Sequence, residues 1–497
     1  MNRLRGLRVT LAVLFLVMAL LLFVDFTGTI HTYMGWLAKI QFIPALLGLH
    51  VGVVLGLFLL TLIFGRLYCS VICPLGLFQD AISRFASMTQ KKRKFSYSPA
   101  KSVLRYIFLA IFVVSFIAGL GSIVALLEPY SAFGRMVSTL LAPLYKSGNN
   151  ILAYLAERVD SYAFYTTDIL MINIGMIVIS ILTFLIVGYL AWRNGRTYCN
   201  TVCPVGTILG FVSRFSILKI VVDNEKCNGC RKCVRACKSS CITATSREID
   251  YSRCVVCFNC IDSCNQGAIT YGLRAKKSEL KVVESKVDSS KRNMLAISAT
   301  LLATSALKAE EKMVDGGLAT IEDKKIPLRQ TPIVPAGAGS LRNFSKSCTG
   351  CQLCVTVCPN QVLRPATGLT NFMQPEMSYE RGYCRPECTK CSEVCPAGAI
   401  NKIDRAEKSS TQIGHAVWIE KNCVVLTDEV KCGNCAAHCP TGAIRMVLPK
   451  DKERYGDREI PVVNIERCIG CGACENLCPA RPFSAIYVEG HTQHKTI

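Results

Sequence analysis

The sequence predicts an α-helical membrane bundle joined to two cysteine-rich α+β modules. Three observations predict this architecture: 51% of the 497 residues are apolar, the apolar residues gather in long runs, and most of the 29 cysteines lie in two blocks behind those runs. The mean hydropathy of +0.33 is high for a chain without membrane segments. The length leaves room for three or four domains.

Four apolar runs reach the length of about 20 residues that a bilayer requires. They cover residues 7–25, 43–64, 104–127 and 169–191, and we expect them to form a transmembrane domain of four helices within residues 1–215. The first run is long enough to remain as a membrane anchor instead of being cleaved as a signal peptide.

The net charge of +22 lies almost entirely in the first part of the chain. Residues 310–497 carry 23 basic and 21 acidic side chains, a balance of +2, so the remaining +20 lies in residues 1–309. Most of these basic residues stand in short segments beside the apolar runs. By the positive-inside rule, both ends of the four-helix bundle face the cytoplasm. The pattern fits this rule better than a nucleic-acid-binding surface, so we expect no nucleic-acid partner.

The bundle contains an internal repeat with two cysteine pairs. RLYCSVICPLG at residues 66–76 recurs 130 residues later as RTYCNTVCPVG. Cysteines four residues apart share one face of a helical turn, which pairs Cys69 with Cys73 and Cys199 with Cys203. Two such pairs facing each other would supply four thiolates for a further iron–sulfur cluster or another soft-ligand metal. Disulfides, ordinary thiols and a thiol–disulfide relay are the alternatives.

Residues 223–272 carry two runs of four cysteines with the spacing Cys-x2-Cys-x2-Cys-x3-Cys. The runs are Cys227, Cys230, Cys233, Cys237 and Cys254, Cys257, Cys260, Cys264. In bacterial ferredoxins, three thiolates of each run hold one [4Fe–4S] cube and the fourth reaches the neighbouring cluster. We therefore expect Cys264 to complete the first cluster and Cys237 the second. Cys241 could replace Cys237, but the spacing favours Cys237 and leaves Cys241 as a buried free thiol.

Residues 345–497 carry four further quartets, each ending in Cys-Pro. They are Cys348, Cys351, Cys354, Cys358; Cys384, Cys388, Cys391, Cys395; Cys423, Cys432, Cys435, Cys439; and Cys468, Cys471, Cys474, Cys478. The proline stops the chain from continuing as a helix through the last ligand. Exchange of the fourth cysteines between adjacent quartets and exchange in a nested order both remain open. Every cysteine is a ligand in either case, so the two modules predict six [4Fe–4S] clusters.

Haem is the usual alternative for electron transfer through a helix bundle, and it needs His or Met ligands. His50 is the only histidine in the four apolar runs. A lone histidine is more often packed or in contact with quinone than half of a haem site, so we expect no b-type haem. Glu128, at the outer end of the third run, either helps to deprotonate a quinol or is a solvated loop carboxylate.

These motifs carry a resemblance to two known families. Residues 1–272 resemble the NapH/MauN family of membrane ferredoxin-type proteins, with four spans, two Cys-x3-Cys-Pro motifs and a cytoplasmic ferredoxin with two clusters. Residues 290–497 resemble NapG/MauM-type periplasmic ferredoxins, with four quartets behind a twin-arginine export signal. The membrane half also resembles NosR-type and CcoG-type proteins. The resemblance implies a fused pair that takes electrons from membrane quinol and delivers them to a periplasmic reductase or c-type cytochrome.

The segment between the modules resembles a twin-arginine signal at Ser290-Lys291-Arg292, with Lys291 in place of the first arginine. A charged linker covers residues 273–292, a run of apolar and small residues fills 293–308, and a second linker covers 309–344. A short apolar run of this kind is typical of the core of an export signal. We expect an internal signal that is retained as a fifth anchor helix and places the last module in the periplasm.

The sequence thus predicts a multi-pass protein of the bacterial inner membrane that transfers electrons from quinol, as a component of a quinol dehydrogenase. The alternative is a maturation or regulatory protein of the NosR/CcoG type, which would supply electrons for the assembly of another metal centre. A purely structural scaffold is disfavoured by the 28 cysteines that fall into quartets or pairs. The chain shows no recognisable nucleotide loop, flavin motif or hydrolytic triad, so the terminal chemistry belongs to a partner.

Overall fold

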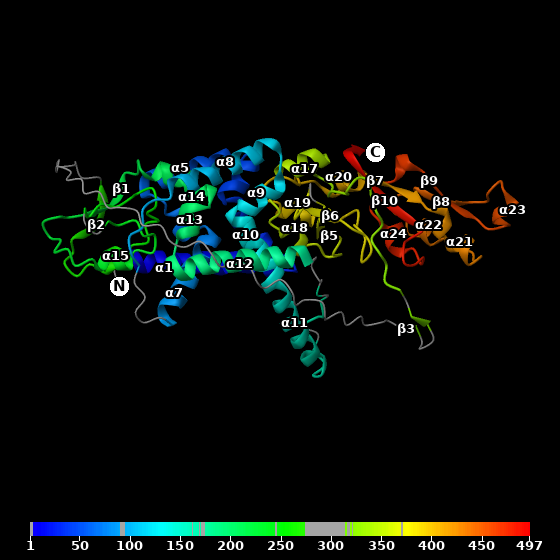
Figure 1. The fold of residues 1–497 in the computed structure, drawn as a ribbon. Helices are drawn as coiled ribbons and strands as arrows, with labels where there is room; N and C mark the ends of the chain where they lie inside the picture. The colour runs from blue at the N-terminus through cyan, green and yellow to red at the C-terminus, as the bar shows by residue number, and fades with distance from the viewer. Residues whose placement is uncertain are drawn as a thin grey trace, which may run out of the picture.

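The protein forms three bodies in a row. The computed structural model describes residues 3–89, 95–161, 163–167, 169, 174–243, 246–273, 314–315, 319–320, 322–368 and 371–497. A cysteine-rich module lies at one end, the helical bundle in the middle and the second cysteine-rich module at the other end (Figure 1). The export signal predicted at residues 293–308, and the linker before it from residue 274 onward, lie outside the described residues.

Each of the four predicted spans is helical, but two of them are interrupted. The elements are α1 (Arg3–Val24), α4 (Phe42–Leu47) with α5 (Val51–Phe64), α8 (Ser102–Ala118) with α9 (Gly121–Leu127), and α12 (Ile174–Asn194). Among the described helices, α1 and α12 alone are long and apolar enough to cross a membrane by themselves. Gly119 ends α8 with a φ of +74°, a left-handed conformation that glycine adopts without steric cost.

The four segments run alternately from one module to the other. At the first module, Arg5 of α1 forms an ion pair with Asp262, and the Phe64 carbonyl at the end of α5 accepts a hydrogen bond from Tyr271. At the second module, α9 and α12 reach Met373, which packs with Ala125 and Met176. The contacts at the two ends therefore place one module at each end of the bundle.

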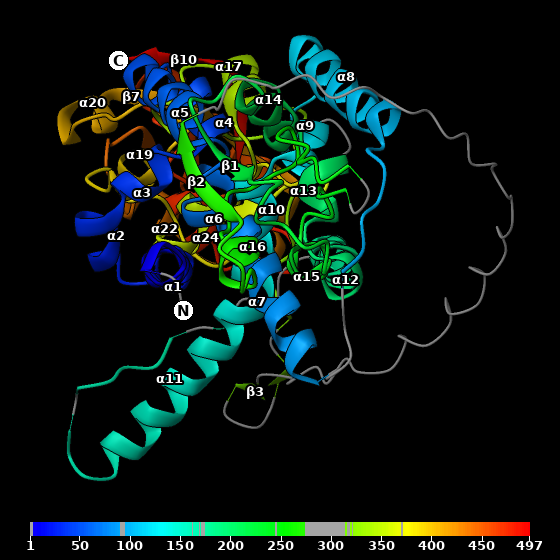
Figure 2. The same cartoon turned by 90° about the vertical axis from the view of Figure 1, so that its left-hand side faces the viewer.

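Shorter helices complete the bundle. They are α2 (Thr29–Met34), α3 (Trp36–Lys39), α6 (Tyr68–Val71), α7 (Pro74–Thr89), α10 (Pro129–Met136), the π-helix η1 (Val137–Leu141), α11 (Ala142–Glu157), α13 (Thr197–Thr201) and α14 (Pro204–Ser213). The two sequence repeats become matching units, α6–α7 and α13–α14, in which a proline opens the second helix. Helix α11 projects away from the body in both views (Figures 1 and 2).

The first module is small and is closed by a two-stranded sheet. Strand β1 (Leu218–Val222) pairs antiparallel with β2 (Ile269–Leu273), with Leu218 opposite Leu273. Between the strands lie α15 (Lys232–Ala236) and α16 (Asn259–Asp262). Each of these helices starts inside a cysteine run, after a residue with positive φ that turns the chain.

The second module contains two hydrophobic cores and several short antiparallel pairs. Its helices are α17 (Leu341–Ser347), α18 (Leu353–Thr356), α19 (Lys390–Val394), α20 (Arg405–Ser410), α21 (Val424–Thr427), α22 (Asn434–Ala437), α23 (Lys452–Tyr455) and α24 (Ala473–Leu477), with 3₁₀ turns at Glu420–Asn422 and Ile465–Arg467. The strand pairs are β3 (Val314–Asp315) with β4 (Ala319–Thr320), β5 (Leu363–Pro365) with β6 (Pro375–Met377), β7 (Thr411–Trp418) with β10 (Ile486–Thr496), and β8 (Ile444–Val447) with β9 (Ile460–Val463). Side chains of β10 alternate between buried and partly exposed from Ile486 to Gly490, which fits a strand that covers the core with one face.

Candidate iron–sulfur sites

The first module gathers its cysteines around two cavities. Group 1 lines one cavity and consists of Cys227, Cys230, Cys233 and Cys264. Group 2 lines the other and consists of Cys237, Cys254, Cys257 and Cys260, with Cys241 beside them. The structure therefore places the last cysteine of each run with the first three of the other, in the arrangement that ferredoxin exchange predicts.

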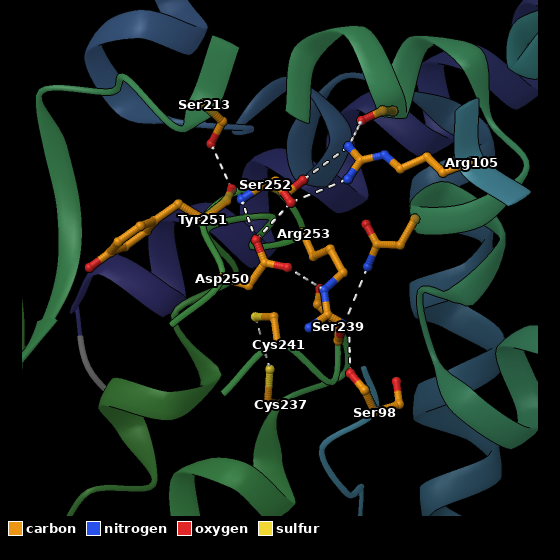
Figure 3. A network of polar contacts seen from close by, with 12 residues as sticks. Ser98, Arg105, Ser213, Cys237, Ser239, Cys241, Asp250, Tyr251, Ser252 and Arg253 are labelled. Atoms are coloured by element: carbon orange, nitrogen blue, oxygen red, sulfur yellow. Dashed lines mark hydrogen bonds and ion pairs between the residues drawn. The ribbon is translucent and has the colours of Figure 1, made fainter. Parts of the chain in front are cut away.

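Cys241 is buried, as the sequence predicts, but it lies among the cysteines of group 2. Its sulfur is 3.5 Å from Cys237 Sγ (Figure 3), and it also shares a hydrogen bond with Cys254. The hydrogen bond with Cys241 is the main cause that lowers the pKa of Cys237 to about 6, and it lowers the pKa of Cys254 as well. The same bonds raise the pKa of Cys241. The lowered pKa values of Cys237 and Cys254 favour the thiolate form that binds metal.

The first two quartets of the second module exchange their last cysteines. Group 3 brings Cys395 into electrostatic contact with Cys348, Cys351 and Cys354. Group 4 consists of Cys358, Cys384, Cys388 and Cys391, which line a cavity. Lys408 also lines this cavity, with its Nζ atom 3.2 Å from Cys384 Sγ. Burial alone would lower the pKa of Lys408, but the sulfurs of Cys384 and Cys391 outweigh it and raise that pKa.

The last two quartets exchange in the same way. Group 5 consists of Cys439, Cys468, Cys471 and Cys474. Group 6 consists of Cys423, Cys432, Cys435 and Cys478. The structure thus shows the adjacent pairing of quartets and not the nested one. Cys423 lies beside Cys432 and Cys435, although eight residues separate it from Cys432 in the chain.

The two cysteine pairs of the bundle meet in its interior and form the bundle quartet. Cys73 lies near enough to Cys69 and Cys199 for their charges to interact. Cys203 interacts in the same way with Cys69, Cys73 and Cys199. Each of the four is at most 5% exposed. Within the described residues, no three ligand side chains converge on a single metal ion. An iron–sulfur cube needs no such convergence, because each of its thiolates binds a different iron.

Two buried arginines cross between the repeats beside this quartet. Arg66 donates to Asn200 Oδ1 at 2.8 Å and to the Cys199 carbonyl at 3.3 Å, both in the other repeat. Arg196 donates to the Cys69 carbonyl at 2.7 Å, and each guanidinium lies 3.8 Å from the first cysteine sulfur of its own repeat. Two fixed positive charges beside four thiols suit a centre whose thiolates bring excess negative charge. The donor set therefore fits an iron–sulfur cluster.

The sequence did not assign a role to these arginines, although the signal was present. An arginine stands three residues before the first cysteine in both copies of the repeat. Two further polar residues follow the first copy on α7. Gln79 donates to Cys199 Sγ at 3.2 Å, and Asp80 accepts from Arg196 at 2.7 Å and from Lys238 at 2.5 Å. Asp80 thereby joins the two repeats to the first module.

Group 2 lies next to the bundle quartet. Arg66 donates to the Ser252 carbonyl at 2.9 Å and lies in electrostatic contact with Cys254. Arg105 of α8 reaches the same Ser252, whose hydroxyl donates to Asp250, and Asp250 in turn holds Arg253 (Figure 3). This polar joint fixes the first module against the bundle.

On the other side, buried polar residues lie between the bundle quartet and group 3. Tyr198 lies near enough to Cys203 and Arg135 for electrostatic interaction. Arg135 interacts in the same way with Cys351 of group 3. Glu128 is 1% exposed and caps α10 by accepting a hydrogen bond from Tyr130 N at 3.0 Å. The solvated-loop interpretation of Glu128 is therefore wrong. His50 is exposed and directly precedes α5, without a capping hydrogen bond from its side chain.

The groups of the second module follow one another away from the bundle. Group 3 lies near enough to group 4 for the charges of Cys354 and Cys391 to interact. Group 4 meets group 5 where Cys384 N donates to the Cys471 carbonyl at 2.9 Å. Group 5 lies near enough to group 6 for the charges of Cys474 and Cys435 to interact. The spatial order is therefore group 1, group 2, bundle quartet, then groups 3, 4, 5 and 6.

Comparisons with known proteins find iron–sulfur domains in this chain. The family described as a 4Fe-4S binding domain matches residues 46–95 and 174–221, which include the bundle quartet. The family described as a 4Fe-4S dicluster domain matches residues 347–399 and 430–481. These matches support iron–sulfur clusters in this chain.

Similar curated proteins are ferredoxin-type proteins. The chain is 28% identical over 169 residues to the methylamine utilization ferredoxin-type protein MauM of Methylobacillus flagellatus (33% of this chain, 70% of that protein). It is 30% identical over 155 residues to the ferredoxin-type protein NapG of Escherichia coli (29% and 64%) and 29% identical over 163 residues to NapF of the same species (32% and 87%). No solved structure matches the chain.

Proposed function

We propose that this chain, a ferredoxin-type iron–sulfur electron-transfer protein related to MauM, NapG and NapF, carries electrons from membrane quinol to a partner docked on its second module. The observation that carries the proposal is the unbroken row of cysteine groups from one end of the molecule to the other. When bound, each [4Fe–4S] cluster supplies a centre that takes up and releases one electron.

The outer surface of the helix bundle supports the proposal that the bundle lies within the membrane. Its outer face carries large exposed apolar side chains on all four crossing segments, among them Val13, Leu55, Val114 and Leu185, which are 56%, 57%, 64% and 56% exposed. An apolar surface that surrounds a bundle suits lipid better than water. Basic residues gather at the end of the bundle that carries the first module. The proposal therefore puts the first module in the cytoplasm and the second in the periplasm.

The chain itself arranges the sites and adjusts their surroundings. Cysteine runs hold groups 1 to 6 in the modules, and the bundle quartet would hold a seventh cluster. Arg66 and Arg196 compensate charge in the apolar interior, where unpaired thiolates would be costly. Packing of the bundle excludes water from the quartet, while Lys408 places a positive charge beside group 4.

Quinol reduction of the purified full-length protein tests the proposal. In liposomes, the quinol should bleach the visible iron–sulfur absorbance of a protein that holds about 28 iron atoms per chain, four for each of seven sites. A protein that dithionite bleaches and quinol does not would refute the assignment of quinol as donor. It would favour the alternative role in metal-centre assembly.

Protease protection tests the two-sided arrangement. In right-side-out vesicles the second module should be digested and the first protected, and inverted vesicles should give the opposite result. Digestion of both modules in the same vesicles would show that they share one compartment, contrary to the proposal.

A further inference from the structure

A cavity lies where the bundle meets the second module, next to group 3. Its walls come from the end of α1, the π-helix η1, the start of α11 and helix α18. Figure 1 shows α18 against the bundle near the point where α11 leaves it. Val24, the last residue of α1, and Met176, near the start of α12, line the cavity, so it opens at the end of the apolar bundle that faces the second module.

The walls of the cavity suit a flat apolar ring. Phe23 and Phe26 line it. The Phe23 ring centroid is 5.3 Å from that of Tyr130, and the Phe26 centroid is 5.9 Å from that of Tyr165. Aromatic neighbours hold these two phenylalanines in place and so keep the cavity preformed.

Two polar atoms in this cavity have no hydrogen-bond partner within the described part of the chain. They are Thr139 Oγ1 and Gln352 Oε1, which belong to two residues that line the cavity, and their side chains are 7% and 2% exposed. A buried polar atom without a hydrogen bond lowers the stability of the fold unless a ligand or a water molecule supplies the missing partner.

The local backbone explains why both atoms are left without a partner. Buried Thr61, in the ordinary helix α5, donates to the carbonyl four residues earlier at 2.8 Å. Thr139 lies in a π-helix, a rare form that often marks functional sites, and makes no such bond. The Gln352 amide is fixed by bonds from Nε2 to the carbonyls of Gly350 at 3.2 Å and Met373 at 2.6 Å, so its Oε1 cannot exchange places with the nitrogen.

This pair of atoms defines the chemistry of the ligand. Gln352 Oε1 can only accept a hydrogen bond, whereas the Thr139 hydroxyl can donate or accept. A quinol offers a flat ring with a hydroxyl at each end, so it can donate to Gln352 and bond to Thr139. The oxidised quinone has carbonyl groups, which only accept hydrogen bonds and so cannot donate one to Gln352 Oε1. A lipid acyl chain would leave both atoms without partners.

We infer that this cavity binds the ring of a membrane quinol, with Gln352 Oε1 and Thr139 Oγ1 as its hydrogen-bond partners. The inference rests on the proposed function and adds the location of the donor. Gln352 follows Cys351 directly, so the bound ring lies beside group 3. The site prefers quinol to quinone because only the reduced ring satisfies Gln352.

Photolabelling with an azido-quinol tests binding separately from electron transfer. In the full-length protein, label should enter the peptides that contain Thr139 or Gln352, and excess unlabelled quinol should compete better than the same quinone. Ala142→Phe, which fills the cavity, should remove the label. Labelling confined to other peptides, or unchanged in Ala142→Phe, would overturn the site.

Kinetics of quinol oxidation give the second test. Thr139→Val and Gln352→Met should each raise the quinol KM about five- to tenfold, as expected for the loss of one hydrogen bond. Thr61→Val, a buried helical threonine away from the cavity, should leave KM unchanged. Iron content and bleaching by dithionite show that each variant holds its clusters.

The two proposals fail in different ways. Wild-type KM values in Thr139→Val and Gln352→Met, with quinol still bleaching the wild-type clusters, would refute the cavity as the site and leave the proposed function standing. Absence of bleaching by quinol in the wild type would refute the proposed function, and the quinol site with it.

Discussion

The bundle quartet and the groups of the two modules bring four cysteines together by different routes. In groups 1 to 5, three cysteines come from one short run and only the fourth comes from elsewhere; group 6 takes Cys423 across a longer gap. In the bundle quartet, two cysteines come from each of two repeats that lie 130 residues apart. A local run can form its turn early, whereas the quartet exists only when both repeats have docked.

The two kinds of site also differ in how they balance charge. Group 4 has one lysine, Lys408, at 3.2 Å from a sulfur, whereas two arginines with no exposure cross the bundle quartet. The bundle interior offers no water to solvate thiolates, so guanidinium groups must take that role. The bundle quartet therefore depends on long-range polar contacts, and we expect it to be the more fragile kind of site.

Arg196→Leu should produce the largest effect. Asp80 would lose its contact at 2.7 Å and the Cys69 carbonyl would lose a buried donor. Lys238 and Arg8 would still pair with Asp80, so the cost should stay below the about 3–5 kcal/mol of a fully uncompensated buried charge. The variant should unfold at a lower temperature and lose about four iron atoms, those of the bundle quartet. Arg193→Leu, at the exposed end of α12 and three residues before Arg196, serves as the control. Full iron content in Arg196→Leu would show that the quartet does not need this guanidinium.

Cys199→Ser should remove the bundle quartet without unfolding the modules. The expected loss is about four iron atoms per chain, with the signals of the other groups retained. Measurement of iron and acid-labile sulfide checks this result. An unchanged iron content would assign the four cysteines to thiol chemistry instead of a cluster.

Cys237→Ser and Cys241→Ser should separate a ligand from its neighbour in group 2. Cys237→Ser should cost about one cluster, whereas Cys241→Ser should keep it and alter only the hydrogen bonds to Cys237 and Cys254. Electron paramagnetic resonance of the reduced protein distinguishes the two outcomes. Loss of the cluster in Cys241→Ser alone would make Cys241 the ligand.

Lys408→Met should give the smallest effect, a shift in one reduction potential. The ammonium beside Cys384 stabilises the more negative, reduced state, so its removal should lower the potential of group 4 by on the order of 60 mV, a tenfold change for a one-electron couple. Potentiometric titration measures it, with the exposed Lys402→Met as control. A potential equal to that of the wild type would show that solvent already screens this charge.

The sequence patterns predicted which segments are helical better than they predicted where each helix begins and ends. The apolar runs at residues 43–64 and 104–127 were predicted as unbroken spans, but the helices break at residues 48–50 and 119–120. Gly119 ends its helix with a positive φ, which glycine adopts without steric cost. Hydropathy does not show such a break, because the residues on both sides of it are equally apolar. The prediction for residues 293–308 stays a prediction.

The sequence by itself determined which residues are candidates: the cysteine runs, the repeated pairs and the apolar segments. These features are local, and three thiols within seven residues can face one cluster whatever surrounds them. The tertiary structure alone decided the adjacent exchange of quartets, the meeting of the two pairs, the burial of Glu128 and the spatial order of the groups. Those outcomes join residues that are far apart in the chain, and the packing of the bundle and modules brings them together where spacing carries no information.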